Sequence, residues 1–209
     1  MITSERSIDY FYSAHSAFAY IGAGYLNEIA QQFQVRINHY PVDLHKVMQA
    51  AGSTSFSDRS KPHLRYFFGT EIERWCRKRA VHWLGRIPTH HHKGYELANR
   101  FLIAAQQMSG DIDQLSHHFV RSHWVEDIDL SDERALVAVS DEINFEGERI
   151  LQRALTEDSL RVYRQHTEVA IRRFVLGSPT YFLNDEMFYG QDRLDFVESA
   201  IKSLVESQT

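Results

Sequence analysis

Segments with the composition of β-strands lie only near the two ends of this chain, and that distribution restricts its fold more than any other feature. Residues 7–13 are rich in Ile, Tyr and Phe, and residues 35–42 form a second run of this kind. Between the two runs, apolar residues recur at helical spacing, at Leu26, Ile29, Ala30 and Phe33. Strand, helix and strand in this order predict a βαβ unit with two buried, parallel strands.

The middle of the chain has a different pattern, because no convincing strand signal occurs between about residues 47 and 155. Apolar residues at helical spacing predict amphipathic helices over residues 64–76 and 97–108, with Glu71 among the residues that face solvent. Ser131 is expected to cap a further helix, with acidic residues in its first turn. We therefore expect residues 47–155 to form an all-helical insertion domain.

Strand signals return after the insertion. Residues 160–174 predict a helix that Gly177 ends in the C′ position. Residues 180–183 and a second short strand through Phe188 predict a hairpin, and residues 194–204 a final helix. This order matches an α/β, thioredoxin-like fold with a helical domain inserted after the second strand, whose own two parts are residues 1–46 and 156–209. Periodicity alone leaves other α/β folds open.

Charge and cysteine content restrict the compartment and the partners. The formal net charge is −5, which gives no electrostatic reason to expect a nucleic-acid partner. The single cysteine, Cys76, excludes an internal disulfide and a thiolate metal cluster, and it fits a reducing compartment. No apolar run approaches the roughly 20 residues that span a bilayer. We expect a cytoplasmic protein with no membrane partner.

Three places in the sequence could carry chemistry, and each also has a purely structural explanation. Ser16 lies where the first strand meets the first helix, a position that suits either a ligand or an ordinary N-cap. Pro179 precedes a short strand, and a cis bond there would present the Ser178 backbone to an extended peptide; the alternative is a trans proline. Gln191 and Asp192 open the last helix, where they could bind a charged ligand or only cap the helix.

Taken together, residues 7–20, 177–180 and 190–194 resemble the kappa-class glutathione transferases and their bacterial relatives, the 2-hydroxychromene-2-carboxylate isomerases. The resemblance covers nearly the whole chain. It implies a disulfide-oxidoreductase-like fold of the thioredoxin superfamily, a homodimer, a small-molecule substrate and glutathione as the cofactor. It also implies that Ser16 is the catalytic serine, at the position of the first cysteine of disulfide oxidoreductases, and donates a hydrogen bond to the glutathione sulfur. Ser178, before the matching Pro179, would pair with the cysteinyl backbone, and Gln191 and Asp192 would bind the γ-glutamyl group.

Several residues depart from the pattern of that family. Ala17 stands where the family usually has Pro. Ser53 stands where many members have Asn, so we expect Ser53 to contact the cofactor, and Lys61 or His63 lies near the position of an expected lysine. Met48 stands where the isomerases carry a substrate-side lysine. The missing cation predicts weak or absent turnover of 2-hydroxychromene-2-carboxylate itself and better activity on a related uncharged electrophile.

The function that the resemblance implies is a glutathione-dependent isomerase or transferase acting on an aromatic or conjugated carbonyl compound. The alternative is a non-catalytic thioredoxin-fold protein with a binding or chaperone-like role. A dithiol oxidoreductase is excluded, because thiol exchange needs a cysteine at the cleft. We expect an apolar wall to face the bound sulfur, formed by Phe18, Met48, Phe56 and residues around His91.

The twelve histidines include the run His90, His91 and His92 and the pair His117 and His118. Adjacent histidines on a helix point in different directions, and no matching carboxylate spacing accompanies them, so we predict no metal site. Trp124 and Cys76 are expected in the core of the helical insertion.

Overall fold

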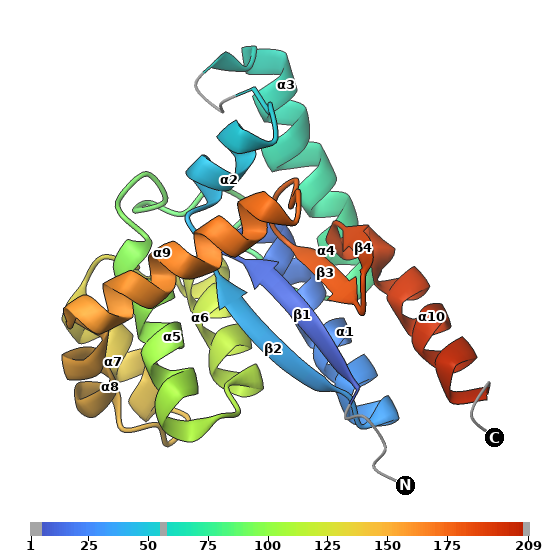
Figure 1. Ribbon diagram of the computed structural model, residues 1–209. Coiled ribbons are helices and arrows are strands. Elements are labelled where there is room, and N and C mark those ends of the chain that lie inside the picture. Colours follow the sequence, from blue (N-terminus) through green and yellow to red (C-terminus); the bar gives the residue numbers. More distant parts are fainter. Residues whose placement is uncertain (1–5, 55–57, 207–209) are drawn as a thin grey trace, which may run out of the picture.

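The computed structural model describes residues 6–54 and 58–206, and its strands form one mixed sheet that joins the two ends of the chain (Figure 1). The strands are β1 (Ser7–Tyr12), β2 (Arg36–Pro41), β3 (Thr180–Leu183) and β4 (Glu186–Tyr189), in the spatial order β2-β1-β3-β4. β1 runs parallel to β2 and antiparallel to β3, and β3 and β4 form a hairpin. The predicted βαβ unit and the predicted hairpin are therefore confirmed.

The described residues between β2 and α9 form helices and loops only. The helices are α1 (Ala17–Phe33), α2 (Leu44–Ala50), α3 (Lys61–Arg65), α4 (Ile72–Arg79), α5 (Glu96–Ser109), α6 (Asp113–Glu126), α7 (Glu133–Asp141), α8 (Gly147–Ala154), α9 (Glu157–Arg172) and α10 (Leu194–Glu206). A π-helical segment, Tyr66–Glu71, joins α3 to α4, and a 3₁₀ turn, Gln191–Arg193, precedes α10. This arrangement confirms a thioredoxin-like fold with a helical insertion after the second strand.

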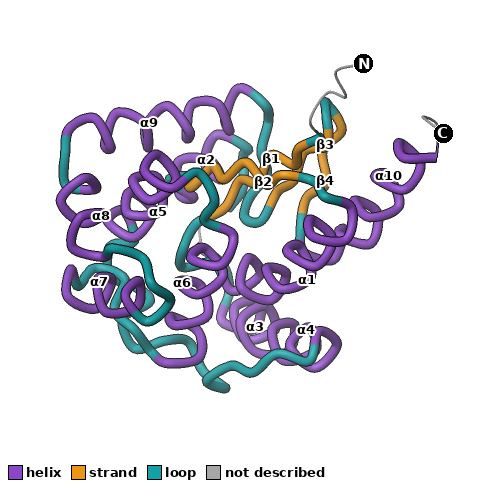
Figure 2. The backbone as a smooth tube through the Cα atoms, turned by 90° about the horizontal axis from the view of Figure 1, so that it is seen from below, coloured by secondary structure: helices purple, strands orange, loops and turns teal. Residues whose placement is uncertain are grey.

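Helices cover both faces of the sheet, with α9 on one face and α1 on the other (Figure 2). β1 lies inside the sheet, between β2 and β3, and its side chains pack alternately against the helices on the two faces of the sheet. Phe11 packs with Phe182 in the smaller core on the α9 side, whereas Ile8, Tyr10 and Tyr12 belong to the larger core on the other side. A strand covered on both faces needs apolar residues at nearly every position, which explains the composition of residues 7–13.

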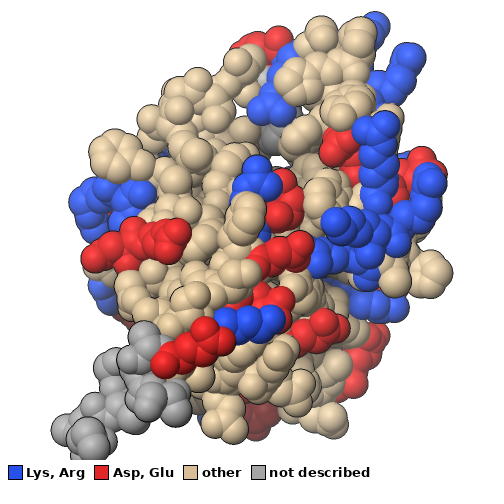
Figure 3. All heavy atoms as spheres, turned by 90° about the vertical axis from the view of Figure 1, so that its right-hand side faces the viewer, with Lys and Arg blue, Asp and Glu red and all other residues tan. Residues whose placement is uncertain are grey.

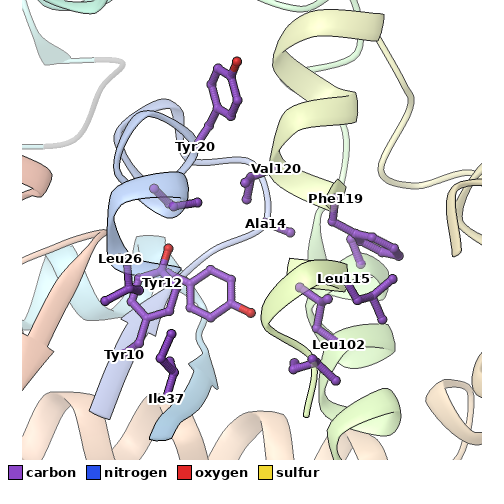
Figure 4. Close-up of a cluster of buried hydrophobic side chains, with 14 of the residues drawn as sticks. Tyr10, Tyr12, Ala14, Tyr20, Leu26, Ile37, Leu102, Leu115, Phe119 and Val120 are labelled. Carbon is purple, nitrogen blue, oxygen red and sulfur yellow. The ribbon is translucent and has the colours of Figure 1, made fainter. Parts of the chain in front are cut away.

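The larger core joins the sheet to the helical insertion. Tyr12 and Ile37, from the strands, lie near Leu102 and Leu115, from α5 and α6, and all four belong to one cluster of buried side chains (Figure 4). Trp124 of α6 is fully buried, and its indole Nε1 donates to the carbonyl of residue 15 at 2.9 Å, in the loop between β1 and α1. Trp124 and Cys76 are therefore core residues, as predicted, and the insertion is packed directly onto the loop where β1 ends.

Two predicted helix ends are wrong. Asp132, not Ser131, caps α7, because its carboxylate accepts from the backbone N–H of the residues that follow, while Ser131 Oγ donates to Asp129. α9 ends at Arg172, and Phe174, not Gly177, adopts the left-handed conformation, with φ of 56°. Arg173 holds that end to the sheet through an ion pair with the Asp9 carboxylate at 2.6 Å.

Gly177 is needed for a different reason than helix termination. A Cβ atom at this position would lie 3.0 Å from the hydroxyl oxygen of Tyr189. The absence of a side chain therefore lets the segment before β3 approach β4 closely.

Basic residues gather on the surface of α4. Arg74 and Arg77 pair with Glu71 and Glu73 at 2.9 and 2.6 Å, and Lys78 is exposed beside them. Figure 3 shows Lys and Arg side chains gathered at the right of the view, on the side of the molecule where α4 lies, with acidic side chains around them. Such exposed pairs contribute little to stability.

Among the described residues, no helix combines the length and the apolar character needed to cross a membrane.

Candidate active site

A pocket of about 420 Å³ opens where β1 ends and α1 begins. Parts of the chain that are far apart in sequence line it: the start of α1, α2, the π-helical segment with α4, the loop at His91, and the segments on both sides of the hairpin. Ligands bind at this kind of sheet edge because the ends of several elements expose unpaired backbone groups there.

Ser16 caps α1 and also lines the pocket. Its hydroxyl oxygen accepts from the backbone N–H of Ala19 at 3.2 Å, and the hydroxyl donates to the carbonyl of Ser178 at 3.2 Å. The predicted N-cap is thus correct, and the same side chain bridges the start of α1 to the segment before β3. Only 7% of Ser16 is exposed, so its hydroxyl acts in a nearly dry environment.

The bond between Ser178 and Pro179 is cis, as predicted. Ser178 lines the pocket, and its Oγ accepts from the backbone N–H of Ser13 at 3.1 Å. Pro179 is buried behind it and does not itself line the pocket, but its carbonyl accepts from the N–H of Gly190 at 2.9 Å. The segment before β3 therefore ties the start of α1 to the turn that precedes α10.

Gln191 and Asp192 lie in the same pocket. Arg79 of α4 donates from Nε to the side-chain carbonyl of Gln191 at 3.3 Å and from Nη2 to its backbone carbonyl at 3.2 Å. Asp192 pairs with Arg193 at 2.6 Å. Together with Ser16 and Ser178 these residues offer a hydroxyl, backbone groups and a carboxylate. That set suits a ligand with an anionic or thiol group, an extended backbone and an ammonium group.

The structure does not bring every predicted contact to the pocket. Ser53 lies in the turn after α2, where its N–H donates to the carbonyl of Met48 at 2.9 Å, and it does not line the pocket. Lys61 and His63 are exposed on α3 and are likewise outside the lining. Arg59, which the sequence did not single out, lines the pocket.

A second group of residues that line the pocket is largely aromatic, and we call it the aromatic wall. Phe18, Met48 and His91 line it, as expected, whereas Phe56 lies outside the described residues. The sequence also missed the aromatic residues Tyr66, Phe67, Phe68 and Trp75 of this wall, and Glu71, which lines the pocket beside them. A helical wheel with a constant 3.6-residue period placed Glu71 toward solvent, but the wider turns of the π-helical segment change the register and bring it to the pocket.

Histidine and tyrosine rings pack against one another next to the aromatic wall: His15 and His91 line the pocket, and Tyr95 and His123 pack against them. The ring of His15 stacks on that of Tyr95, with centroids 3.9 Å apart, and lies 5.3 Å from the ring of His91. Burial lowers the pKa of His91 to about 3 and also lowers the pKa values of His15 and His123. These rings are therefore neutral at pH 7. Within residues 6–54 and 58–206, no group of three or more His, Cys, Asp or Glu side chains is arranged to hold a metal ion.

The cysteine is not part of the reactive surface. Cys76 is 3% exposed, and burial raises the pKa of its thiol to about 11. No cysteine stands at Ser16 or at Ala19, three residues later on α1, where a dithiol enzyme would carry its pair.

Comparisons with known proteins agree with this fold. The sequence model of the DSBA-like thioredoxin domain family matches residues 7–202. The 2-hydroxychromene-2-carboxylate isomerase of Sphingobium xenophagum is 25% identical over 206 residues, covering 93% of this chain and 97% of the relative. A solved structure of selenomethionine 2-hydroxychromene-2-carboxylate isomerase has a TM-score of 0.81 at 23% identity and covers 97% of both chains.

A second solved structure is the cytosolic disulfide reductase DsbM from Pseudomonas aeruginosa with GSH. Its TM-score is 0.65 at 13% identity, and the match covers 97% of this chain and 98% of that one. These findings confirm the thioredoxin-like fold and the resemblance to 2-hydroxychromene-2-carboxylate isomerases.

Proposed function

The chain belongs to the DSBA-like thioredoxin domain family, and we propose that within it this protein is a glutathione-dependent isomerase of the 2-hydroxychromene-2-carboxylate isomerase type. Its substrate is an aromatic or conjugated carbonyl compound. The observation that carries the proposal is the pairing of two walls in one pocket. Ser16, Ser178 and Asp192 lie on a polar wall, and an aromatic wall that includes Phe18 and Phe67 lies in the same pocket. Curated relatives that carry the isomerase name support it.

The polar wall fits glutathione group by group. Asp192 offers a carboxylate to the γ-glutamyl ammonium group, and the turn that Gln191 opens offers backbone N–H groups to the neighbouring carboxylate. Ser178 offers backbone polar groups to the cysteinyl unit, in the manner of strand addition. A volume of about 420 Å³ is in the usual range of small-molecule sites.

Ser16 has one hydroxyl proton, and that proton can serve two purposes in turn. It is donated to the carbonyl of Ser178 at 3.2 Å. When the hydroxyl rotates to donate to a sulfur, the Ser178 carbonyl becomes an acceptor for an amide N–H of the ligand. The N-terminus of α1 then stabilises negative charge on the sulfur. A thiol that titrates near 8.5 in water should have its pKa lowered by about one to two units in this position.

When bound, glutathione would supply a thiolate that adds to the conjugated carbon of the substrate and leaves again after bond rotation, so no oxidant or reductant is consumed. The aromatic wall holds the flat substrate against the sulfur and excludes water. Met48 offers no charge to a substrate carboxylate, whereas the guanidinium of Arg59 lies in the same pocket. Turnover of 2-hydroxychromene-2-carboxylate with and without glutathione therefore tests whether a cation other than the missing lysine is sufficient.

The decisive experiment is a calorimetric titration with glutathione, followed by measurement of the bound thiol's pKa from thiolate absorbance. We expect binding at millimolar glutathione or below, and we expect Ser16→Ala to raise the pKa of the bound thiol by about one unit or more. The affinity should fall only modestly.

Ser16→Gly is the matched control, because glycine is tolerated at an N-cap at a cost of a few tenths of a kcal/mol, whereas alanine costs about 1 kcal/mol. Both variants lack the hydroxyl, so both should raise the pKa of the bound thiol even though only Ser16→Ala weakens the cap. An unchanged thiol pKa in both variants would make Ser16 a cap alone. No binding at millimolar glutathione would favour the non-catalytic, chaperone-like alternative.

A further inference from the structure

The loop that carries His91 has no regular secondary structure, yet it is fixed on both sides of that residue. Before it, the carboxylate of Asp127 accepts from the backbone N–H of Thr89 and from Arg86, both at 2.6 Å. After it, the ammonium group of Lys93 donates to Asp129 at 2.6 Å. Two carboxylates at the end of α6 thus hold the loop in place, and the ring of His91 has a defined position in the pocket wall.

The hydrogen bonds behind His91 determine which of its nitrogens carries the proton. His123 Nδ1 lies 2.9 Å from the carbonyl oxygen of Ile128, and a carbonyl only accepts, so this nitrogen carries the proton of the neutral ring. His123 Nε2 is then the acceptor, and His91 Nδ1 donates to it at 3.1 Å. The remaining nitrogen of His91, Nε2, therefore carries a lone pair.

The adjacent ring of His15 has the opposite polarity. Asn99 Nδ2 donates to Ser13 Oγ at 3.2 Å, and among the described residues the one acceptor in hydrogen-bond contact with the Ser13 hydroxyl is His15 Nδ1 at 2.8 Å, so the hydroxyl donates to that nitrogen. His15 Nε2 consequently carries the proton of that ring. A donor and an acceptor thus belong to two rings that both line the pocket and whose centroids are 5.3 Å apart. One oxygen atom hydrogen-bonded to both can span that separation.

The neighbours of His91 keep its Nε2 atom unprotonated. The ring is surrounded by His15 from the β1–α1 loop, Phe68 from the π-helical segment, Trp124 and His123 from α6, and His92 and His45, and none of these side chains is an anion. Burial and this company lower the pKa of His91, so the lone pair persists throughout the neutral range. A ring with such a low pKa is a weak base, which favours binding over proton abstraction.

We propose that His91 and His15 form a subsite for a hydroxyl group on the aromatic substrate. His91 Nε2 accepts a hydrogen bond from the hydroxyl group, and His15 Nε2–H donates one to the hydroxyl oxygen. Among common oxygen groups, a hydroxyl both donates and accepts, whereas an ether or a ketone only accepts. This inference rests on the proposed function for the class of substrate, and it assigns recognition of the substrate hydroxyl to two residues of this chain, His91 and His15.

The test compares two probes that differ in one group: o-hydroxybenzylideneacetone, whose hydroxyl donates and accepts, and o-methoxybenzylideneacetone, whose ether oxygen only accepts and carries one extra methyl group. Binding is measured without any thiol, by quenching of the fluorescence of Trp75, which lines the pocket, together with that of the other tryptophans. The wild-type protein should bind the hydroxy probe about three- to tenfold more tightly, the range expected for one neutral hydrogen bond. His91→Phe should abolish this preference, and His91→Gln, which restores an acceptor oxygen, should retain part of it.

His92→Ala is the matched control, because His92 is the exposed neighbour on the same loop and does not line the pocket; its preference should equal that of the wild type. Equal binding of both probes by the wild type, or a preference that survives in folded His91→Phe, overturns the inference. If His91→Phe does not fold, His91→Leu replaces it, and the wild-type comparison stands without either variant.

Titration with glutathione separates this result from the proposed function. Glutathione binding without a hydroxyl preference refutes the subsite alone. A hydroxyl preference that depends on His91 without glutathione binding refutes the cofactor and leaves the subsite intact.

Discussion

The two walls of the pocket are built in different ways. The polar wall consists of element ends in the sheet unit: Ser16 at the start of α1, Ser178 before β3, and Gln191 before α10. Its groups are short side chains and backbone atoms, and Ser16 and Gln191 are 7% and 2% exposed. The aromatic wall comes largely from the insertion and includes large, half-buried rings such as Phe67 and Phe68.

The difference implies that the two walls bind different ligands. Element ends offer fixed hydrogen-bonding groups, which recognise one invariant ligand, whereas aromatic surface is adaptable and accepts a class of flat molecules. If the polar wall binds the cofactor and the aromatic wall binds the substrate, changes in one wall should leave the other ligand's affinity unaffected.

The largest expected effect is a loss of glutathione affinity in Asp192→Asn. Removing one partner of a charge-assisted hydrogen bond costs about 1.5–3 kcal/mol, so the dissociation constant should rise about 10- to 100-fold. Asp185→Asn, the same change at an exposed residue of the hairpin turn, should have no effect. Calorimetry with glutathione measures both.

The reciprocal variant is Phe67→Ala. In the wild-type protein the ring of Phe67 meets that of Phe18 edge to face, with the ring centroids 5.0 Å apart. Its loss should weaken binding of o-hydroxybenzylideneacetone about tenfold and leave glutathione affinity unchanged. If either variant weakened both ligands equally, the two walls would not be separate sites.

A smaller effect is expected where α1 supports the polar wall. A Cβ atom on Gly22 would lie 2.7 Å from Cβ of Gln191 and 3.2 Å from Cδ1 of Leu194, so Gly22→Ala must displace the turn before α10. Overpacking of this kind costs about 1–3 kcal/mol, of which the gain in helix propensity returns about 0.5–1 kcal/mol. Gly22→Ala should therefore lower the free energy of unfolding by about 1 kcal/mol and weaken glutathione binding.

Gly24, on the same helix, is the internal control. A Cβ atom there would lie 3.7 Å from Cε1 of His117, an ordinary contact, so Gly24→Ala should be neutral or stabilising. Urea denaturation of both variants measures the free energies. Equal stability of the two variants would mean that the turn before α10 moves freely.

The same division explains which parts of the site could be predicted from the sequence. Element ends have local signals: a serine after a strand, a proline before a strand, and a glycine with polar residues before a helix. These signals place Ser16, Ser178, Gln191 and Asp192 at element ends, but they fit ordinary caps and a trans proline equally well. The roles of these residues and the cis bond were implied by the resemblance to the isomerases, and the structure brings all four residues into the lining of one pocket and has the cis bond. Local signals fail where two neighbours are equally suitable, as at Ser131 and Asp132, because both residue types are good caps.

The aromatic wall depends on packing between distant segments, which no local pattern reports. His91 and His123 are separated by 32 residues in the sequence and meet only because loop and helix are tied together by carboxylates. Glu71 was assigned to solvent because the π-helical segment is not visible in a helical wheel. Arg59 has no motif of its own and reaches the pocket only through the tertiary fold.

The smallest expected effect tests whether chemistry is confined to these two walls. Cys76 is buried on α4, and burial raises its pKa to about 11, so very little thiolate exists at pH 7. A thiol reagent should modify it only after denaturation, and Cys76→Ala should leave glutathione-dependent turnover unchanged while costing some stability in the core. Rapid modification of the native protein, or loss of turnover in a fully folded Cys76→Ala variant, would mean that the protein's own thiol takes part. In that case the thiol of glutathione would not be the sole nucleophile, contrary to the proposed function, and Ser16 would need a different role.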